Sequence, residues 1–508
     1  MGVKKSLYAD VTSLNPEVTG SCHQVSVHYP DGRRTMFLVD CGLFQEKGYN
    51  HKNGEPFPFK CENIEFVLVT HAHADHIGRI PMLYRDGYNG LVYATPGTGR
   101  LMKPSLRNSY QIMKEDAKRH KEKVLYEEDD LELALASIEY CKYEQVQYVH
   151  PNIKVTFFNN GHLVGAAVIF VQISYPGEKD INLFFTGDYK AENKFFEVKE
   201  LPSFLYNLPM TVITESTYGY MDACEIKYHM ESDIIKALKS GKTLLISVFA
   251  LERAQSILFM LKSLQDRGEI RTDIPIGLDG GLAQDYTRMF LNSNLGLDPT
   301  KLDFLPESFE FIGKENREMV VRRNRQQIIL TTSGMLDHGP AQFYLPSFVE
   351  RKDVIIYIPG YCAENTLGYK IQHPEDGLII LDKKERNVRA TVMTTNELSS
   401  HAKADELLEL LNRFTKLNLV LVNHGATDSK LQFAWRVEEE VKTKQVEILG
   451  EHTFRVSAYG YVKHMKSKLS PTSVRKEAKK EEKDQKPKKK KQPKLKRVRV
   501  QRCRYCLR

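Results

Sequence analysis

The stretch that decides the fold is "THAHADHIGR", residues 70–79, which directly follows the apolar run "IEFVLV" at residues 64–69. A short apolar run that ends at a turn is typical of a buried β-strand. His71 and His73 are two positions apart at the exit of this strand, so both side chains can face one point. Histidines arranged in this way are unsuited to a hydrophobic core and suggest that their side chains bind something.

Asp75 and His76 continue the pattern into the turn that begins the next helix, and they give a second cluster beside the first. Neutral imidazole and carboxylate groups suit Zn²⁺, which they bind at ~2.0–2.2 Å. The alternative is a polar loop that happens to be rich in histidine. Four candidate ligands in the order H-x-H-x-D-H after a strand disfavour that alternative. The stretch therefore predicts a metal site at the end of a strand.

The composition indicates a folded chain of several domains. A length of 508 residues suffices for two or three domains with buried cores, and an apolar fraction of 41% is typical of a folded, soluble protein. No run approaches the ~18 uninterrupted apolar residues that a membrane helix needs, so we expect no membrane partner. The cysteines of the body occur singly, which favours a reducing compartment, the cytoplasm, over a disulfide framework.

The charge is uneven along the chain. Residues 466–508 hold 19 Lys and Arg against four Asp and Glu, which is +15, so the net charge of +8 leaves 8 − 15 = −7 for the body. This basic tail has little to bury and is predicted to be disordered. One interpretation of the tail is a solubilising segment, and another is a nuclear-import signal, which would place a eukaryotic protein in the nucleus. A third is an arm that binds RNA phosphates or a protein partner. The "CRYC" motif at Cys503–Cys506 has the spacing of a metal-binding pair but no second pair nearby.

Three regions of the body differ in pattern. Up to Thr214, short strand-like runs such as "RTMFLVD" and "AVIFVQIS" dominate, interrupted by the long helical pattern "RLMKPSLRNSYQIMKEDAKRHKEK". Helices then alternate with short, continuously apolar strands such as "KTLLISVFA" and "QQIILTTSG", which indicates a parallel sheet covered by helices. The helix "KADELLELLNRF" and the strand "NLVLVNHGA" follow. We therefore expect domain segments at 1–216, 217–392 and 393–465, and the basic tail at 466–508.

The stretch at residues 70–79 resembles the signature of the metallo-β-lactamase superfamily, whose fold is a four-layer αββα sandwich. The resemblance continues along the chain: Asp40 ends an early strand in "FLVDCG", His162 lies on a Gly-flanked loop in "NNGHLVGAA", and Asp188 follows a strand in "LFFTGDYK". Taken singly, His162 would more often be a loop histidine without a metal. The order and strand context of the whole set resemble the family.

The region 217–392 resembles the β-CASP domain that is inserted in the nucleic-acid-processing members of this superfamily. Glu215 in "VITESTYG" matches the acidic residue of motif A, and His401 in "LSSHAKADEL" matches the histidine of motif B. His424 in "LVLVNHGATDS" matches the motif C histidine of RNA-acting members, where DNA-acting relatives typically carry an apolar residue. The implied fold is α/β: an αββα metallo-β-lactamase sandwich with an inserted parallel α/β β-CASP domain.

The resemblance covers nearly all of residues 1–465. It is close to bacterial and archaeal β-CASP ribonucleases and to the endonuclease subunit of messenger-RNA 3′-end processing. The segment "TTSGML" favours the endonuclease type over the exonuclease-rich group.

The resemblance also implies two zinc ions per chain. One would be held by His71, His73, His162 and a bridging Asp188, and the other by Asp75, His76, His424 and the same Asp188. Two cations ~3.5–4 Å apart lower the pKa of water and clamp the oxygens of a phosphodiester. Asp40 is expected to orient a ligand by accepting its hydrogen bond. His401, supported by Glu215, is the expected general acid, although Glu215 could instead be an ordinary surface acid at a strand end.

Three further residues are expected to bind the RNA backbone. Ser247 and Ser333 end two strands and Arg253 begins a helix, and ligands of open α/β sheets gather at such positions. Arg253 could alternatively make a salt bridge between domains.

We therefore expect a zinc-dependent ribonuclease, with single-stranded RNA as its partner and a homodimer left open. A DNA nuclease of the same superfamily is the nearest alternative, and His424 opposes it. A small-molecule hydrolase of the lactamase type would not need the long insertion, and a catalytically silent RNA-binding subunit would not need a complete ligand set.

Overall fold

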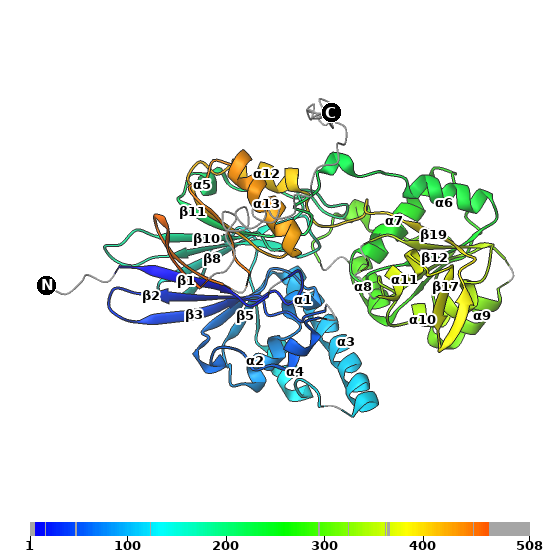
Figure 1. Ribbon diagram of the computed structural model, residues 1–508, viewed down its shortest axis with the longest axis horizontal. Helices are drawn as coiled ribbons and strands as arrows, with labels where there is room; N and C mark the ends of the chain where they lie inside the picture. Colours follow the sequence, from blue (N-terminus) through cyan, green and yellow to red (C-terminus); the bar gives the residue numbers. More distant parts are fainter. Residues whose placement is uncertain are drawn as a thin grey trace, which may run out of the picture.

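The protein has two lobes, as the ribbon in Figure 1 shows. One lobe is built from the two ends of the described chain, and the other from its middle, with the helices labelled α6 to α11. The computed structural model describes residues 6–466, apart from residues 16, 46–47, 122, 293–294, 324, 361, 363–365 and 451. No helix within this part of the chain is long and apolar enough to cross a bilayer.

The first lobe contains two sheets. The first sheet has the strand order β23-β22-β1-β2-β3-β4-β5-β6, antiparallel from β23 to β3 and parallel from β3 to β6. Its strands are β1 (Tyr8–Ser13), β2 (His23–His28), β3 (Arg34–Val39), β4 (Phe66–Leu68), β5 (Leu91–Ala94), β6 (Ile138–Tyr140), β22 (Thr453–Ser457) and β23 (Gly460–Lys466).

The second sheet of this lobe has the order β21-β20-β11-β10-β9-β8-β7 and is parallel from β21 to β10. Its strands are β7 (Gln147–His150), β8 (Ile153–Asn159), β9 (Ala167–Ile173), β10 (Ile181–Phe185), β11 (Met210–Thr214), β20 (Leu417–Val422) and β21 (Val446–Ile448). The strands expected from "AVIFVQIS" and "NLVLVNHGA" are therefore confirmed as β9 and β20.

The two sheets share one hydrophobic core. Inward-facing residues of the first sheet, such as Val25 and Phe37, pack in one cluster with Leu183 and Leu421 of the second, and all four are fully buried. Residues of one strand face opposite sides of a sheet in alternation, so each sheet also presents an apolar outer face that must be covered.

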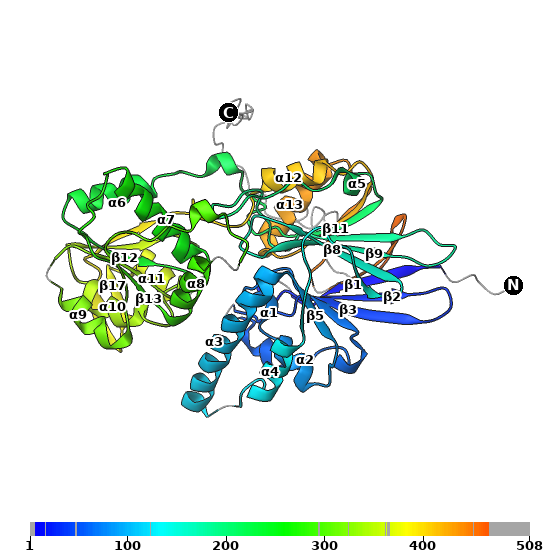
Figure 2. The ribbon, with the colours of Figure 1, turned by 180° about the vertical axis from the view of Figure 1, so that it is seen from behind.

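Helices cover these outer faces and complete the αββα sandwich. The first sheet is covered by α2 (Ile80–Arg85), α3 (Pro96–His120) and α4 (Glu128–Ala136), and the second by α5 (Ser203–Tyr206), α12 (Ala404–Asn412) and α13 (Thr427–Glu440). Figures 1 and 2 show α12 and α13 on one side of the two sheets and α2 to α4 on the other. The expected sandwich is confirmed.

The second lobe is a six-stranded, fully parallel sheet in the order β14-β13-β15-β12-β16-β19. Its strands are β12 (Thr243–Ser247), β13 (Ile276–Asp279), β14 (Phe309–Phe311), β15 (Ile328–Thr331), β16 (Val354–Ile358) and β19 (Thr391–Thr394). A small antiparallel pair, β17 (Leu378–Leu381) and β18 (Lys384–Asn387), is added to it. The parallel α/β domain expected here is confirmed.

Helices cover both faces of this sheet because alternate strand residues face opposite sides. Leu244 and Ile246 pack with α6 (Met230–Lys239), α7 (Arg253–Asp266) and α8 (Gly281–Leu291). Leu245 packs on the other face, with α9 (Arg317–Arg322), α10 (Ala341–Phe348) and α11 (Leu367–Gln372). Residue 392, which we took as a domain boundary from the sequence, lies within β19.

The parallel strands bring several loops to one edge of the first lobe. In the first sheet β3 and β4 run in the same direction, and in the second sheet β10, β11 and β20 do. The loops that follow their carboxyl ends can therefore meet where the two sheets face each other, and this arrangement positions the site described next.

Candidate metal centre

Seven candidate ligands converge at the carboxyl edge of the two sheets. The short helix α1 (Ala74–Ile77) and the loop after β4 carry His71, His73, Asp75 and His76, while His162 lies between β8 and β9, Asp188 follows β10, and His424 follows β20. The four segments are far apart in the sequence and meet because their strands end at the same edge.

The first cluster consists of His71, His73, His162 and Asp188, whose ligand atoms all lie within 4.8 Å of one another. His73 Nδ1 is 3.2 Å from the Nε2 atoms of both His71 and His162, and Asp188 Oδ2 is 3.5 Å from His71 Nε2 and 3.6 Å from His162 Nε2. Donor atoms held ~2.0–2.1 Å from a tetrahedral cation are about 3.3 Å apart, so the spacing suits one Zn²⁺-sized ion.

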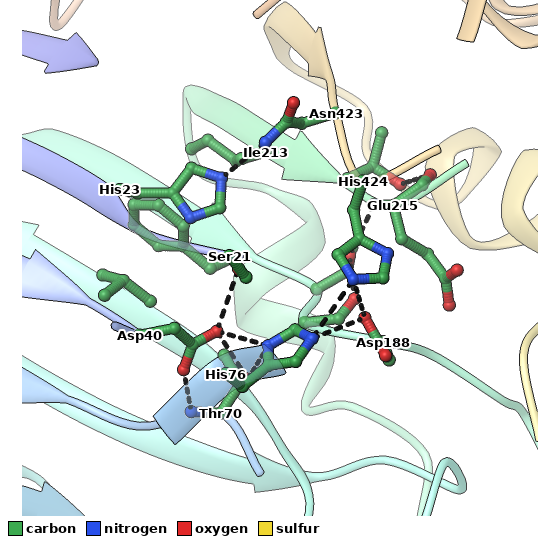
Figure 3. A pocket seen from close by; sticks show the side chains of 15 residues that line it. Ser21, His23, Asp40, Thr70, His76, Asp188, Ile213, Glu215, Asn423 and His424 are labelled. Atoms are coloured by element: carbon green, nitrogen blue, oxygen red, sulfur yellow. Dashed lines mark hydrogen bonds and ion pairs between the residues drawn. The ribbon is translucent and has the colours of Figure 1, made fainter. Parts of the chain in front are cut away.

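The second cluster consists of Asp75, His76 and His424, again with all ligand atoms within 4.8 Å. The Nε2 atoms of His76 and His424 are 3.2 Å apart, and both face Asp188 Oδ1, at 3.4 and 3.3 Å. Figure 3 shows these two rings and Asp188 pointing toward one another. Asp188 therefore turns one carboxylate oxygen to each cluster, which is the arrangement of a bridging ligand.

The electrostatics of the two clusters also fit cations. Burial lowers the pKa of His73 to about 4 and holds the pKa values of His71 and His162 well below 6.5, so these rings are neutral at pH 7 and can use their lone pairs for a metal. Asp188 is buried, and its Oδ1 atom accepts no hydrogen bond from the described residues. A buried carboxylate oxygen without a donor is costly unless a cation faces it.

Asp40 contacts the candidate ligand His76 and is not itself in either cluster. Its carboxylate accepts hydrogen bonds from the amide and the hydroxyl of Thr70, both at 2.8 Å, and lies 2.8 Å from His76 Nδ1. His76 Nδ1–H therefore donates to Asp40, which fixes the ring with its Nε2 directed at the second cluster. Figure 3 shows this chain from Thr70 through Asp40 to His76.

Glu215 and His401 form a pair beside the first cluster. Glu215 follows β11 and is buried, so it is not a surface acid; its Oε2 is 3.0 Å from His401 Nδ1, and its Oε1 accepts a hydrogen bond from the amide of Tyr189. Burial alone would lower the pKa of His401, but the carboxylates of Glu215 and Asp188 raise it above 6.5 overall. The ring lies 3.8 Å from Asp188 and can carry a proton to this edge of the centre.

The three residues expected to bind RNA belong to the other lobe, and no described contact joins them to the ligand clusters. Ser247 and Ser333 lie at or just beyond the carboxyl ends of the neighbouring strands β12 and β15, and the buried hydroxyl of Ser247 has no hydrogen-bond partner among the described residues. Arg253 begins α7 and donates to the carbonyl of Pro359 in the same lobe, and the described part of the chain offers it no ion pair. The salt bridge between domains that we considered as an alternative is therefore not formed there.

The part played by Glu252 was not predicted. This residue lies at the start of α7 with a φ of 62°, and its buried carboxylate accepts hydrogen bonds from the amide of Val164, at 2.9 Å, and from the side chain of Asn193. Asn193 also donates to the carbonyl of Gly161, at 3.0 Å. These bonds connect the second lobe to the loop that carries His162. An acidic residue inside the apolar segment "SVFALERAQ" was the signal that could have pointed to it.

Lys403 was also missed. It lies two residues after His401, is fully buried, and places its ammonium group 3.2 Å from the centre of the Tyr218 ring. Burial lowers the pKa of Lys403 to about 7. In the sequence this residue begins the helical pattern "KADELLELLNRF", and packing against a distant tyrosine is not visible there.

The chain matches three family models. A metallo-beta-lactamase superfamily domain matches residues 31–180, a Beta-Casp domain matches residues 254–371, and a Zn-dependent metallo-hydrolase RNA specificity domain matches residues 385–449. The first match lies in the first lobe and the second match in the second lobe, whereas the third runs from β18 of the second lobe to β21 of the first. The first match includes the candidate ligands that precede residue 180, and the third includes His401 and His424.

Curated relatives match over most of their length. "Ribonuclease TTHA0252" of Thermus thermophilus is 32% identical over 430 residues, which are 82% of this chain and 92% of the relative. "Transcription termination factor FttA" of Methanocaldococcus jannaschii is 30% identical over 447 residues, which are 82% of this chain and 67% of the relative. "RNase J-like protein" of the same organism is 28% identical over 434 residues, 83% of this chain and 95% of the relative.

The role of Asp40 can be tested with Asp40→Asn. Asparagine tolerates the positive φ of 62° at this position and keeps the size of the side chain, so the fold should survive. Because an amide cannot hold the tautomer of His76 as a carboxylate does, we expect the metal affinity to fall by about 10–100-fold. Metal content per chain, measured by elemental analysis after dialysis against a series of free zinc concentrations, gives the affinity.

Asp31→Asn is the matched control, because Asp31 lies in an exposed turn before β3 and pairs with Arg33. It should bind metal as the unaltered protein does. Equal metal affinities for Asp40→Asn and the unaltered protein would mean that Asp40 does not orient the ligand.

Proposed function

The chain belongs to the β-CASP group of the metallo-β-lactamase superfamily, and from this membership we propose that it is a ribonuclease that hydrolyses RNA phosphodiester bonds with two zinc ions per chain. The metallo-β-lactamase fold and the ribonuclease relatives support a metal-dependent hydrolase that acts on RNA. Within this proposal we prefer endonuclease cleavage to 5′-exonuclease action, and we place the reaction in RNA processing or decay.

The observation that carries the proposal is the position of Asp188 between two complete clusters. His71, His73 and His162 would hold one zinc ion and Asp75, His76 and His424 the other, with Asp188 shared. When bound, two such cations supply an acidified water at neutral pH and neutralise the charge that develops on a phosphodiester. The fit of the donor spacing to a tetrahedral ion supports zinc rather than Mg²⁺, which prefers oxygen ligands.

The protein's own groups have separate tasks in this proposal. Asp40 keeps His76 in the tautomer whose Nε2 faces the second cluster, and the loop held by Glu252 keeps His162 in the first. His401 donates its Nδ1 proton to Glu215, so its Nε2 proton can go to the leaving oxygen of the cleaved bond. The pair thus acts as the general acid, next to the metals and without a ligand role.

The edge of the second lobe is the proposed RNA-binding surface. Ser247 pairs in register with Thr331, so the carboxyl ends of β12 and β15 lie side by side, with Ser333 two residues further on. Arg253 starts the 14-residue helix α7, whose N-terminus favours phosphate. The hydroxyl of Ser247, which bonds to none of the described residues, supports a ligand contact at this edge.

RNA is preferred over DNA because the chain has His424, which faces Asp188 and completes the second cluster. A small-molecule hydrolase is less well supported, because such an enzyme has no use for the second lobe. We place the reaction in a reducing compartment, the cytoplasm, since the six described cysteines form no disulfide and five of them are buried thiols.

The function is tested with end-labelled linear RNA, circular RNA and DNA of the same sequence. We expect metal-dependent cleavage of both RNAs and little cleavage of DNA, because circular RNA has no end from which an exonuclease could start. Cleavage should stop with a chelator and return with zinc, and elemental analysis should find about two zinc ions per chain. Active protein with well under one zinc per chain would contradict the proposal, and cleavage of linear RNA alone would make the enzyme an exonuclease.

The general acid is tested with His401→Ala and Glu215→Gln. His401→Ala should slow cleavage by about 10²–10⁴-fold while the zinc content stays normal. The carboxylate of Glu215 raises the pKa of His401, and the acid works only while protonated. In Glu215→Gln this pKa falls, so the alkaline limb of the pH profile of kcat should move to lower pH.

His51→Ala serves as the control, since His51 is exposed and belongs to neither ligand cluster. Loss of zinc in His401→Ala would make His401 a ligand. An unchanged pH profile in Glu215→Gln would mean that Glu215 does not raise the pKa of the general acid.

The basic tail lies outside the described residues from residue 467 onward, and its role remains a proposal. The backbone of β23 reaches Lys466 opposite Thr453, next to Ser13, whose hydroxyl accepts a hydrogen bond from Asn423. The tail therefore starts at the end of the sheets where the metal centre lies, on a body that carries −7.

A chain truncated after Lys466 should keep its kcat at saturating RNA and bind RNA with lower apparent affinity. The slope of log Kd against log salt should also become shallower, by ~0.7 for each phosphate that the protein no longer neutralises. Cleavage and binding of one RNA at three salt concentrations, for full-length and truncated protein, provide the measurement. Identical slopes would leave a protein partner or nuclear import as the tail's role.

A further inference from the structure

A second cavity, of about 390 Å³, opens in the first lobe away from the metal centre. Four lysines and one tyrosine give it its character: Lys179, Lys416, Lys442, Lys444 and Tyr459. We call it the lysine cavity. None of its lining residues takes part in the ligand clusters or in the proposed acid pair.

The lysine cavity lies at the opposite end of the second sheet from the metal centre. Lys179 precedes β10 and Lys416 precedes β20, whereas Asp188 and His424 follow the carboxyl ends of the same two strands. The strand β20 has six residues, so its ends are about 20 Å apart. A path over the protein surface is longer than this straight line through the sheet.

The rim of the cavity is held by backbone hydrogen bonds. The carbonyl of Lys416 accepts from the amide of Met210, at 3.0 Å, and the amide of Lys444 donates to the carbonyl of Leu417, at 3.3 Å. The side chain of Asn418 donates to the carbonyl of Ala458, at 3.3 Å, which holds the turn before Tyr459. Four separate segments of the chain are thus held together around the cavity.

The charges of the lysine cavity are available for a ligand. All four lysines are exposed, and none of them forms an ion pair within the described part of the chain. Four unneutralised ammonium groups around one hollow stand out on a body whose net charge is −7. Such a cluster attracts a polyanion and repels cations.

Tyr459 adds a flat apolar surface to this positive charge. Its side chain is 66% exposed, and the ammonium group of Lys179 lies 5.0 Å from the centre of its ring. An exposed aromatic ring beside lysines is the combination that binds single-stranded nucleic acid, because bases stack on the ring while the lysines contact phosphates. An acidic peptide would use the lysines but would have no base to stack on the ring.

We propose that the lysine cavity binds a second segment of single-stranded RNA, with its phosphates on the lysines and one base on Tyr459. The proposal rests on the proposed ribonuclease function, because the bound segment would belong to an RNA whose other part lies in the metal centre. Seven of the cavity's eleven lining residues fall within residues 385–449, the stretch that matches the RNA specificity domain. The cavity favours RNAs long enough to reach both ends of the sheet.

The test compares two RNAs on the full-length protein, an unstructured one of about 30 nucleotides and one of about two, which is too short to bridge the ~20 Å between cavity and centre. In the double variant Lys416→Ala/Lys442→Ala the KM of the long RNA should rise by about 10-fold, and the slope of log Kd against log salt should fall by about 1.4, since each neutralised phosphate contributes ~0.7. Tyr459→Ala should weaken long-RNA binding by about 5-fold. The short RNA should be cleaved as before by both variants.

The matched control is Lys236→Ala/Lys239→Ala, which removes two lysines from the last turn of α6 in the other lobe. The proposal is overturned if this control weakens long-RNA binding as much as the cavity variant does, or if Tyr459→Ala changes nothing while poly-glutamate competes as well as RNA. The latter result would make the cavity a general anion site. If the protein cuts no RNA at all, the proposed function fails, and binding of the uncut long RNA still tests the cavity.

Discussion

The carboxylate of Asp188 is the group on which the rest of the structure depends. Five imidazoles lie between 3.3 and 3.8 Å from its two oxygens, and the carboxylate itself is buried. A buried charge needs compensation, and His71 and His162, whose pKa values burial holds well below 6.5, cannot provide it. The two oxygens of the carboxylate face two separate clusters, and each sheet contributes candidate ligands around it.

The inserted domain is connected to the first lobe beside this carboxylate. The chain leaves the sandwich just after Glu215 and returns just before His401, and these two residues are 3.0 Å apart. The hydrogen bond between them joins the two connections of the second lobe at the metal centre. Glu252 adds a further connection, from α7 to the loop that carries His162. Tyr286 adds another, from α8 to the carbonyl of Leu101 in α3. The second lobe is thus held against the candidate metal centre.

The distribution of charge follows the same plan. The first cluster combines a carboxylate with imidazoles that burial keeps neutral, so this bare cluster attracts cations and not RNA. Positive charge lies elsewhere: at Arg253 in the second lobe, in the tail that follows Lys466, and in the lysine cavity at the far end of the second sheet. In the proposed function, this separation gives the metal ions and the RNA phosphates each the charge that they require.

The sequence alone determined the kinds of ligand, their order and the strands that present them. These features are local: a strand followed by "HAHADH" or "NHG" places its side chains at a carboxyl edge wherever that strand lies, and the family resemblance supplied the sandwich and the insertion. The αββα layers, the parallel second lobe and the burial of Glu215 agree with those expectations. The sequence did not locate the end of the second lobe: the expected boundary at residue 392 falls inside β19.

Only the tertiary structure decided which oxygen of Asp188 faces which cluster, that Glu252 reaches Val164, that Lys403 is buried against Tyr218, and that four scattered lysines surround one cavity. Each of these depends on the packing of segments far apart in the sequence. A pattern of residues records the period of a helix or strand, but the partner that a side chain meets is set by how the finished elements pack.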